Sequence, residues 1–204
     1  MASDNFIEKF RTRITRVLGI ALILLLAFGE SRWEITWEPM EEILASIGLF
    51  FVTIAALGRM WCSLYIAGYK TVKLVTQGPY SLCRNPLYVF SFIGAVGMGL
   101  GSATFTVPAA IMTAFLIYYP LTIKSEEGRL SETHGPLYDD YCRKTNRYWP
   151  SFRSYSEPQT YIVEPRLYRK HMMYASLWIL LFGLWEIFEL LREIRIIPVL
   201  FKLW

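Results

Sequence analysis

Apolar residues along this chain gather in blocks that are separated by short polar segments. The five blocks cover residues 14–29, 43–57, 87–102, 103–123 and 172–185, and the second can be extended past Arg59 to Gly68. A bilayer core about 30 Å thick needs about 20 helical residues, so only the fourth block is long enough by itself. The pattern predicts an all-α membrane bundle of about five transmembrane helices, in which the other blocks recruit flanking residues.

The third and fourth blocks are joined by the segment GLGSAT, which carries no charge. We expect these two blocks to form a helical hairpin whose open ends lie on the same side of the membrane. The fifth block is followed by Glu186, Glu189 and Glu193 on one helical face. Because buried charges are costly in lipid, this spacing predicts a short or tilted span that passes into an interfacial amphipathic helix. Whether that helix crosses the bilayer is left open.

Composition and charge agree with this picture. The chain has 204 residues, of which 54% are apolar and 16% aromatic, a composition typical of a membrane protein. Basic residues precede the first block, follow the second and follow the fourth, whereas the loop at residues 31–42 is acidic. The positive-inside rule therefore predicts a cytoplasmic N-terminus, a cytoplasmic loop at residues 70–84 and a cytoplasmic region after Ile123. We expect the first block to be an uncleaved helix rather than a signal peptide, in a membrane that the sequence does not specify.

Several kinds of chemistry lack the residues that they need. The three cysteines are far apart in sequence and form no CxxC pair, and the two histidines, His134 and His171, are expected at the surface. We therefore expect no metal site. No P-loop, GxSxG motif or ordered Ser/His/Asp set is present, and no nucleic-acid partner is expected.

Polar residues that could bind a ligand or take part in catalysis flank the predicted hairpin. Its entrance is TQGPYSLCRNPLY at residues 76–88, and its exit carries Glu126 and Glu127 followed by HGPLYDDY and NRYWPSF. Because a hairpin returns to the side it left, one small polar molecule could contact both ends. Simpler interpretations exist: Asn85 and Pro86 are typical of a helix start, Gly97 and Gly101 of close helix packing, and the Glu pair of a solvated surface.

The order of these motifs resembles a known superfamily. GPY-x-x-x-R-N-P-x-Y, a Gly-rich apolar hairpin, Glu-Glu, G-x-x-Y-x-x-Y and R-Y-x-P are similar to the isoprenylcysteine carboxyl methyltransferase and phospholipid methyltransferase superfamily of integral membrane enzymes. The resemblance covers about residues 58–152. It implies one membrane domain with a methyltransferase-like core at 58–152, N-terminal helices at 1–57, and a linker and helix at 153–204. It also implies S-adenosylmethionine as the cofactor, bound in a cytosolic region.

The resemblance also implies the site residues. The implied cofactor-binding residues are Asn85, Pro86, Tyr88, Gly97, Gly99, Glu126 and Glu127. We add Arg84 from the same turn, and Tyr80 and Tyr138, whose rings could stack on adenine or face the sulfonium. Glu127 and Arg147 are the candidates for a catalytic role, since an arginine can orient an acceptor carboxylate or phosphate through two hydrogen bonds. Asn85 stands where the superfamily more often has His, and an Asn side chain does not titrate. A carboxylate acceptor tolerates that change, because it needs no base.

The leading hypothesis is a membrane-embedded, S-adenosylmethionine-dependent methyltransferase that acts on a lipid-embedded amphiphile and is similar to isoprenylcysteine carboxyl methyltransferase. Its expected partners are a lipid-like or prenylated substrate and membrane lipids. The alternatives are a phospholipid N-methyltransferase, a sterol- or isoprenoid-type NADPH reductase of related fold, and a non-catalytic membrane scaffold. The sequence leaves open the methyl acceptor and the oligomeric state.

Overall fold

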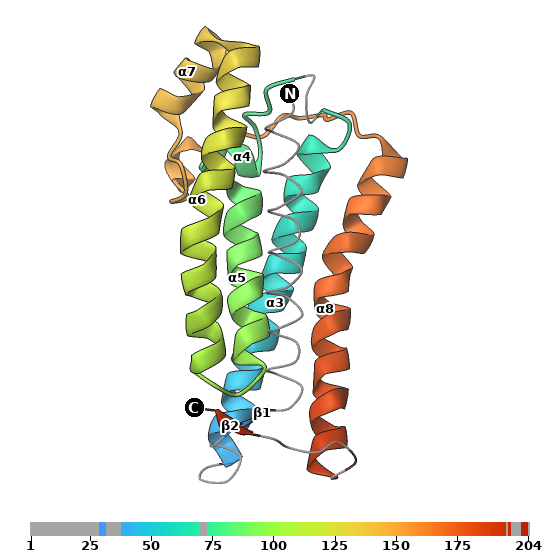
Figure 1. Ribbon diagram of the computed structural model, residues 1–204. Coiled ribbons are helices and arrows are strands. Elements are labelled where there is room, and N and C mark those ends of the chain that lie inside the picture. Colours follow the sequence, from blue (N-terminus) through green and yellow to red (C-terminus); the bar gives the residue numbers. More distant parts are fainter. Residues whose placement is uncertain (1–28, 32–37, 70–72, 195, 197–200, 204) are drawn as a thin grey trace, which may run out of the picture.

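The computed structural model describes residues 29–31, 38–69, 73–194, 196 and 201–203. Its long helices run side by side, and the short helices α4 and α7 lie at one end of the bundle (Figure 1). The elements are β1 (Gly29–Ser31), α3 (Glu38–Ile66), α4 (Pro79–Leu82), α5 (Pro86–Leu100), α6 (Thr106–His134), α7 (Pro136–Lys144), a 3-10 turn η1 (Phe152–Ser154), α8 (Pro165–Glu193) and β2 (Phe201–Leu203). Apart from Gly29, the first predicted span lies outside the described residues.

Three of the described helices are long and apolar enough to cross a membrane. They lie in α3, α6 and α8, at Pro39–Ile66, Thr106–His134 and Pro165–Arg192. Leu116, Leu121 and Leu180 are each more than half exposed in the isolated chain, as expected for side chains that face lipid. The predicted extension of the second block past Arg59 is confirmed, because α3 continues without a break to Ile66.

Helix α5 is shorter and packs between α3 and α6. Its 15 residues span about 22 Å, less than the thickness of a bilayer core. Close approach to α3 depends on glycine: a Cβ atom at Gly97 would lie 2.7 Å from the backbone oxygen of Gly48. At Gly94 an added Cβ would lie 2.7 Å from the Cβ of Ala55. The small residues of α5 thus allow backbone contact between the two helices.

The predicted hairpin of α5 and α6 is confirmed. The two helices are antiparallel neighbours joined by a tight turn (Figure 1). In the turn, the hydroxyl of Ser102 donates a hydrogen bond to the oxygen of Gly99 at 2.7 Å. The indole nitrogen of Trp185 on α8 donates to the oxygen of Gly101 at 3.0 Å. These bonds help to satisfy the polar groups of the turn, which has no charged residue.

The last helix is longer than the apolar block that predicted it. Helix α8 is one continuous helix of 29 residues that begins at Pro165, so it recruits residues before the fifth block and is not short. Its polar face is turned into the protein: Arg192 and Glu189 pair at 3.3 Å with both side chains buried. The long elements among the described residues are all helical, as the predicted all-α class requires, and β1 and β2 add only a short parallel pair at the end opposite α7 (Figure 1).

Candidate active site at the open end of the hairpin

The open end of the hairpin is covered by α4, α7 and the segment between α7 and α8. Gly78 starts this cover with a positive φ of 61°, and its N–H donates to the oxygen of Ser156 at 2.8 Å. A Cβ atom at Gly78 would lie 2.3 Å from the ring of Tyr65, so no larger residue fits there. Tyr141 of α7 donates its hydroxyl proton to the backbone oxygen of Tyr80 at 2.7 Å. Residues far apart in sequence are thereby fixed around one site.

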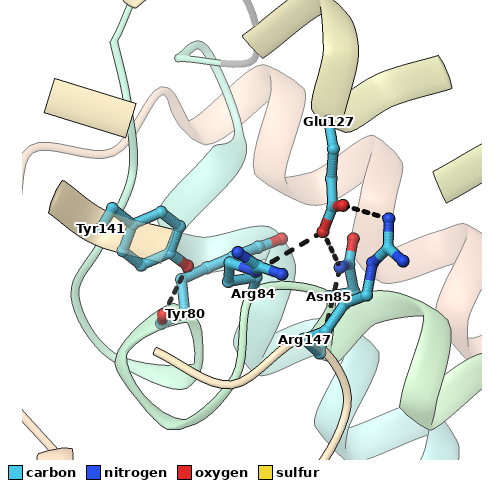
Figure 2. A network of polar contacts seen from close by, with 6 residues as sticks. All are labelled: Tyr80, Arg84, Asn85, Glu127, Tyr141 and Arg147. Atoms are coloured by element: carbon cyan, nitrogen blue, oxygen red, sulfur yellow. Dashed lines mark hydrogen bonds and ion pairs between the residues drawn. The ribbon is translucent and has the colours of Figure 1, made fainter. Parts of the chain in front are cut away.

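Glu127 is the centre of a polar network at this end (Figure 2). The amide nitrogen of Asn85 donates to its Oε1 at 3.0 Å, and the Nε of Arg84 lies 3.5 Å from the same oxygen. The guanidinium of Arg147 donates to its Oε2. One carboxylate therefore ties the start of α5, the end of α6 and the segment after α7 together.

The structure separates the two interpretations of Asn85. The residue occupies the cap position before Pro86, but its side chain makes no capping hydrogen bond to α5. Its amide donates instead to Glu127 and, at 3.2 Å, to the backbone oxygen of Arg147. Asn85 is thus a cap by position, while its side chain belongs to the polar network.

Glu126 makes a separate set of contacts on the neighbouring position of α6. The hydroxyl of Tyr88 donates to its Oε2 at 2.9 Å. Arg129 lies one turn further along α6, with a nitrogen 3.9 Å from Oε1. Because the two Glu side chains meet different partners, they hold different parts of the site.

A cavity of about 460 Å³ lies next to both networks. This volume is in the range of pockets that bind small molecules and cofactors. The cavity is lined by Arg59, Ile66, Lys73, Leu74, Val75, Tyr80, Arg84, Asn85, Leu87, Tyr88, Ser91, Tyr119, Glu126, Glu127, Arg129, Leu130, Thr133, His134, Tyr138 and Tyr141. Apolar, aromatic and charged groups from α3, α5, α6 and α7 therefore face one space.

Most of the residues predicted for cofactor binding meet at this cavity. Those that line it are Tyr80, Arg84, Asn85, Tyr88, Glu126, Glu127 and Tyr138. Pro86 begins α5 beside them. Arg147 contacts Glu127 but is not among the lining residues, so its guanidinium is held by the network.

Gly97 and Gly99 lie elsewhere. They are in the last turn of α5, near the closed end of the hairpin. A Cβ atom at Gly97 would meet the backbone of α3, and one at Gly99 would lie 3.0 Å from the Cα of Pro108 on α6. The structure thus places both glycines in helix contacts and does not bring them to the cavity.

Sequence reasoning missed several lining residues. Arg59, Ser91 and Tyr119 lie inside apolar helices and belong to no motif that we quoted. His134 was expected at the surface, but it is half-buried and also lines the cavity. A charge within a membrane-length apolar run was the one available signal for Arg59, since such charges are often functional.

Burial controls the ionisation of the groups around the cavity. It raises the pKa of Tyr80, Tyr138 and Tyr141, so these phenols stay protonated and act as neutral donors. The hydrogen bond with Glu127 raises the pKa of Arg147, which stays charged. The hydroxyl of Tyr138 is buried and makes no hydrogen bond within the described residues. A polar ligand in the cavity would satisfy it.

Cys83 provides a test of this packing. Burial raises the pKa of its thiol to about 11, so roughly a thousandth of it is thiolate at pH 8. We expect folded protein in detergent to react with iodoacetamide at the more accessible Cys142 first, and Cys83 to react only after denaturation. Mass spectrometry of modified peptides measures both sites. Rapid modification of Cys83 in the folded protein would contradict the described packing of α4 against η1.

Comparison with known proteins identifies the family. The sequence model of the phospholipid methyltransferase family matches residues 40–136, which run from α3 through α6. Among curated proteins, a nickel-cobalt-cadmium resistance protein, NccN of Alcaligenes xylosoxydans xylosoxydans, is 38% identical over 87% of this chain and 81% of its own length. The chain belongs to the phospholipid methyltransferase family. This family indicates a membrane methyltransferase.

A second relative of this methyltransferase-family protein is the cobalt-zinc-cadmium resistance protein CzcN of Cupriavidus metallidurans, 36% identical over 88% of the chain and 81% of its own length. No solved structure matches the chain. Within the part of the chain that the structure describes, no group of three or more His, Cys, Asp or Glu side chains is arranged to hold a metal ion. The family match ends at residue 136, so Tyr138, Tyr141 and Arg147 lie beyond it.

Proposed function

We propose that the protein transfers a methyl group from S-adenosylmethionine to a lipid-embedded amphiphile, with the cofactor in the cavity at the open end of the hairpin. The observation that carries the proposal is the cavity itself, where both Glu residues face the same space as Arg84, Asn85 and Tyr88, and that space is large enough for a cofactor. The charge pattern favours the cytosolic side of the membrane for this end. The cofactor supplies an electrophilic methyl group on a sulfonium.

The lining has the chemistry that this cofactor requires. Its amino group and sulfonium are cationic, and its ribose offers hydroxyl donors, so carboxylates suit it; Glu126 and Glu127 both face the cavity. Tyr80, Tyr88 and Tyr138 provide aromatic faces for adenine or for a cation. The buried hydroxyl of Tyr138 is a donor that makes no hydrogen bond to the described part of the chain. The carboxylates, aromatic rings and hydroxyl donor of the lining therefore match the charged, aromatic and polar groups of the cofactor.

Catalysis by this chain's residues would consist mainly of positioning. Methyl transfer is a displacement that depends on the alignment of two bound molecules. Good alignment can lower the activation free energy by about 7–11 kcal/mol. Glu127, fixed by Arg84, Asn85 and Arg147, forms a rigid wall of the cavity. In this proposal Glu127 holds the cofactor, while Arg147 keeps Glu127 in place and reaches the acceptor only if that ion pair opens.

The names of two relatives suggest a physiological setting. Both are named as metal resistance proteins, and both names include cobalt and cadmium. We propose that this chain's methyltransferase activity contributes to metal tolerance. Expression in a host that lacks its own relative should raise growth in cadmium or cobalt salts, and Glu127→Gln should abolish that gain at equal expression. If the wild-type protein and Glu127→Gln protect the host equally, metal tolerance does not depend on this site.

Cofactor binding is the direct test of the proposed function. Detergent-purified protein should bind S-adenosylhomocysteine in calorimetry with about one site per chain and should not bind NADPH. The ligand should also raise the melting temperature, because it binds only the folded state. Glu132→Gln, an exposed neighbour on α6 outside the cavity, should leave binding unchanged. Binding of NADPH without S-adenosylhomocysteine would instead support the reductase alternative.

A further inference from the structure

A guanidinium lies inside the membrane-spanning part of the bundle. Arg59 is on α3, seven residues before the helix ends at Ile66, which places it about 10 Å below that end. It donates a hydrogen bond to the hydroxyl of Ser91 on α5. Its guanidinium carbon lies 5.8 Å from the ring centre of Trp178 on α8. Three helices therefore hold this cation in one position.

Arg59 has no carboxylate partner among the residues that the structure describes, where its contacts are the Ser91 hydroxyl and the Trp178 ring. Its Nε is buried without a hydrogen bond within the same residues. A charge at this depth is costly unless something compensates it. Arg59 is also a lining residue of the cavity, so a ligand in the cavity can reach it.

The charge of the cavity lining is unevenly matched. Four cationic side chains face the cavity against two carboxylates; they are Arg59, Lys73, Arg84 and Arg129, against Glu126 and Glu127. Glu127 is already shared between Arg84 and Arg147. S-adenosylmethionine carries a net positive charge and does not neutralise this excess. A second ligand with an anionic group would.

The two ends of the cavity suit different ligands. Glu126, Glu127 and His134 mark the water-facing end near the last turns of α6. Tyr119 lies seven residues before Glu126, about 10 Å deeper, at a depth similar to that of Arg59. The deep wall therefore carries Arg59 beside an aromatic ring and, among the described residues, no carboxylate partner for it, whereas at the outer wall both carboxylates are paired with Arg84 and Arg129. An amphiphile that entered from lipid would present its head group to the deep wall.

We propose that Arg59 is a specificity residue that binds the oxyanion of the acceptor's head group, a carboxylate or a phosphate, at the deep end of the cavity. The inference rests on the proposed function for the statement that this second ligand is the methyl acceptor. A guanidinium binds either oxyanion through two parallel hydrogen bonds, and burial strengthens the contact. Ser91 and Trp178 keep the guanidinium in place.

The test compares three probes with twelve-carbon chains in phosphatidylcholine nanodiscs. N-dodecanoylglycine carries a carboxylate, dodecyl phosphate carries a phosphate, and N-dodecanoylglycinamide is neutral. The wild-type chain should bind at least one anionic probe about tenfold or more tightly than the neutral probe. In Arg59→Met this ratio should fall to about one, while affinity for S-adenosylhomocysteine is kept. The preferred anion identifies the head-group class.

Matched variants keep the test decisive. Arg169→Met removes an exposed arginine near the start of α8 and should leave the ratio unchanged. If Arg59→Met does not fold, Arg59→Lys and Ser91→Ala should each lower the ratio several-fold. The first variant loses the planar guanidinium, and the second loses the hydroxyl that holds the guanidinium in position. A ratio near one in the wild-type chain, or one that survives all of these changes, overturns the proposal. So does a loss of S-adenosylhomocysteine binding with the ratio intact, which would place Arg59 against the cofactor.

The two proposals fail separately. If the wild-type chain binds no S-adenosylhomocysteine but prefers an anionic probe through Arg59, the proposed methyl transfer is wrong and the oxyanion site stands. If the cofactor binds and the anionic preference is absent, methyl transfer stands and the role of Arg59 is wrong.

Discussion

Glu127→Gln is expected to lower the affinity for S-adenosylhomocysteine about tenfold or more and to reduce the stability of the protein without ligand. The carboxylate is only 14% exposed, accepts hydrogen bonds from Asn85 and Arg147 and forms an ion pair with Arg84, so the neutral amide leaves two guanidinium groups without their counter-charge. Hydrogen bonds to charged groups contribute about 1.5–3 kcal/mol each, which corresponds to that loss of affinity if one of them involves the cofactor. Calorimetry and thermal melting in detergent measure the two effects.

A second variant distinguishes cofactor binding by Glu127 from its structural role in the polar network. Arg147→Met breaks the same ion pair from the partly exposed side but leaves the Glu127 carboxylate in the cavity. We expect it to lower stability with a smaller loss of cofactor affinity than Glu127→Gln. If both variants lower affinity equally, Glu127 acts only by holding the surrounding segments together. If neither changes affinity, the cofactor does not occupy this cavity.

Gly97→Ala is expected to lower the free energy of unfolding by about 1–3 kcal/mol, the usual cost of overpacking. The added Cβ would lie 2.7 Å from the oxygen of Gly48 and 2.9 Å from the nitrogen of Val52. Backbone atoms of α3 cannot move aside as a flexible side chain would, so the two helices must separate. The gain of about 1 kcal/mol that alanine brings to a helix offsets only part of this cost.

Gly183→Ala is the matched control, because an added Cβ at that position of α8 has nothing within 4 Å. It should leave stability unchanged or raise it slightly. Thermal melting compares the stability of the two variants, and calorimetry of the folded fraction measures their affinity for S-adenosylhomocysteine. Unchanged affinity for S-adenosylhomocysteine in Gly97→Ala supports a packing role. A specific loss of affinity with normal melting would support the predicted role of Gly97 in cofactor binding.

The motifs predicted which residues meet at the open end of the hairpin, because the order of the motifs in the chain limits where they can meet. The hairpin between residues 87 and 123 required Asn85 and Glu127 to lie close together, and their side chains are hydrogen-bonded at 3.0 Å. The same reasoning did not distinguish a glycine that lines a site from one that packs a helix, since both need a small residue. Gly97 and Gly99 are therefore the predicted residues that the structure places away from the cavity.

The sequence by itself determined a membrane protein with long apolar helices, a hairpin and a polar cluster at its open end, because hydrophobic length and charge are local properties of the chain. Only the tertiary structure decided which face each helix turns inward. It joined α8 into one helix with Glu189 and Arg192 buried. It also brought Arg59 of α3 to the same cavity as Glu127 of α6. Such meetings depend on helix rotation and packing, which no single segment specifies.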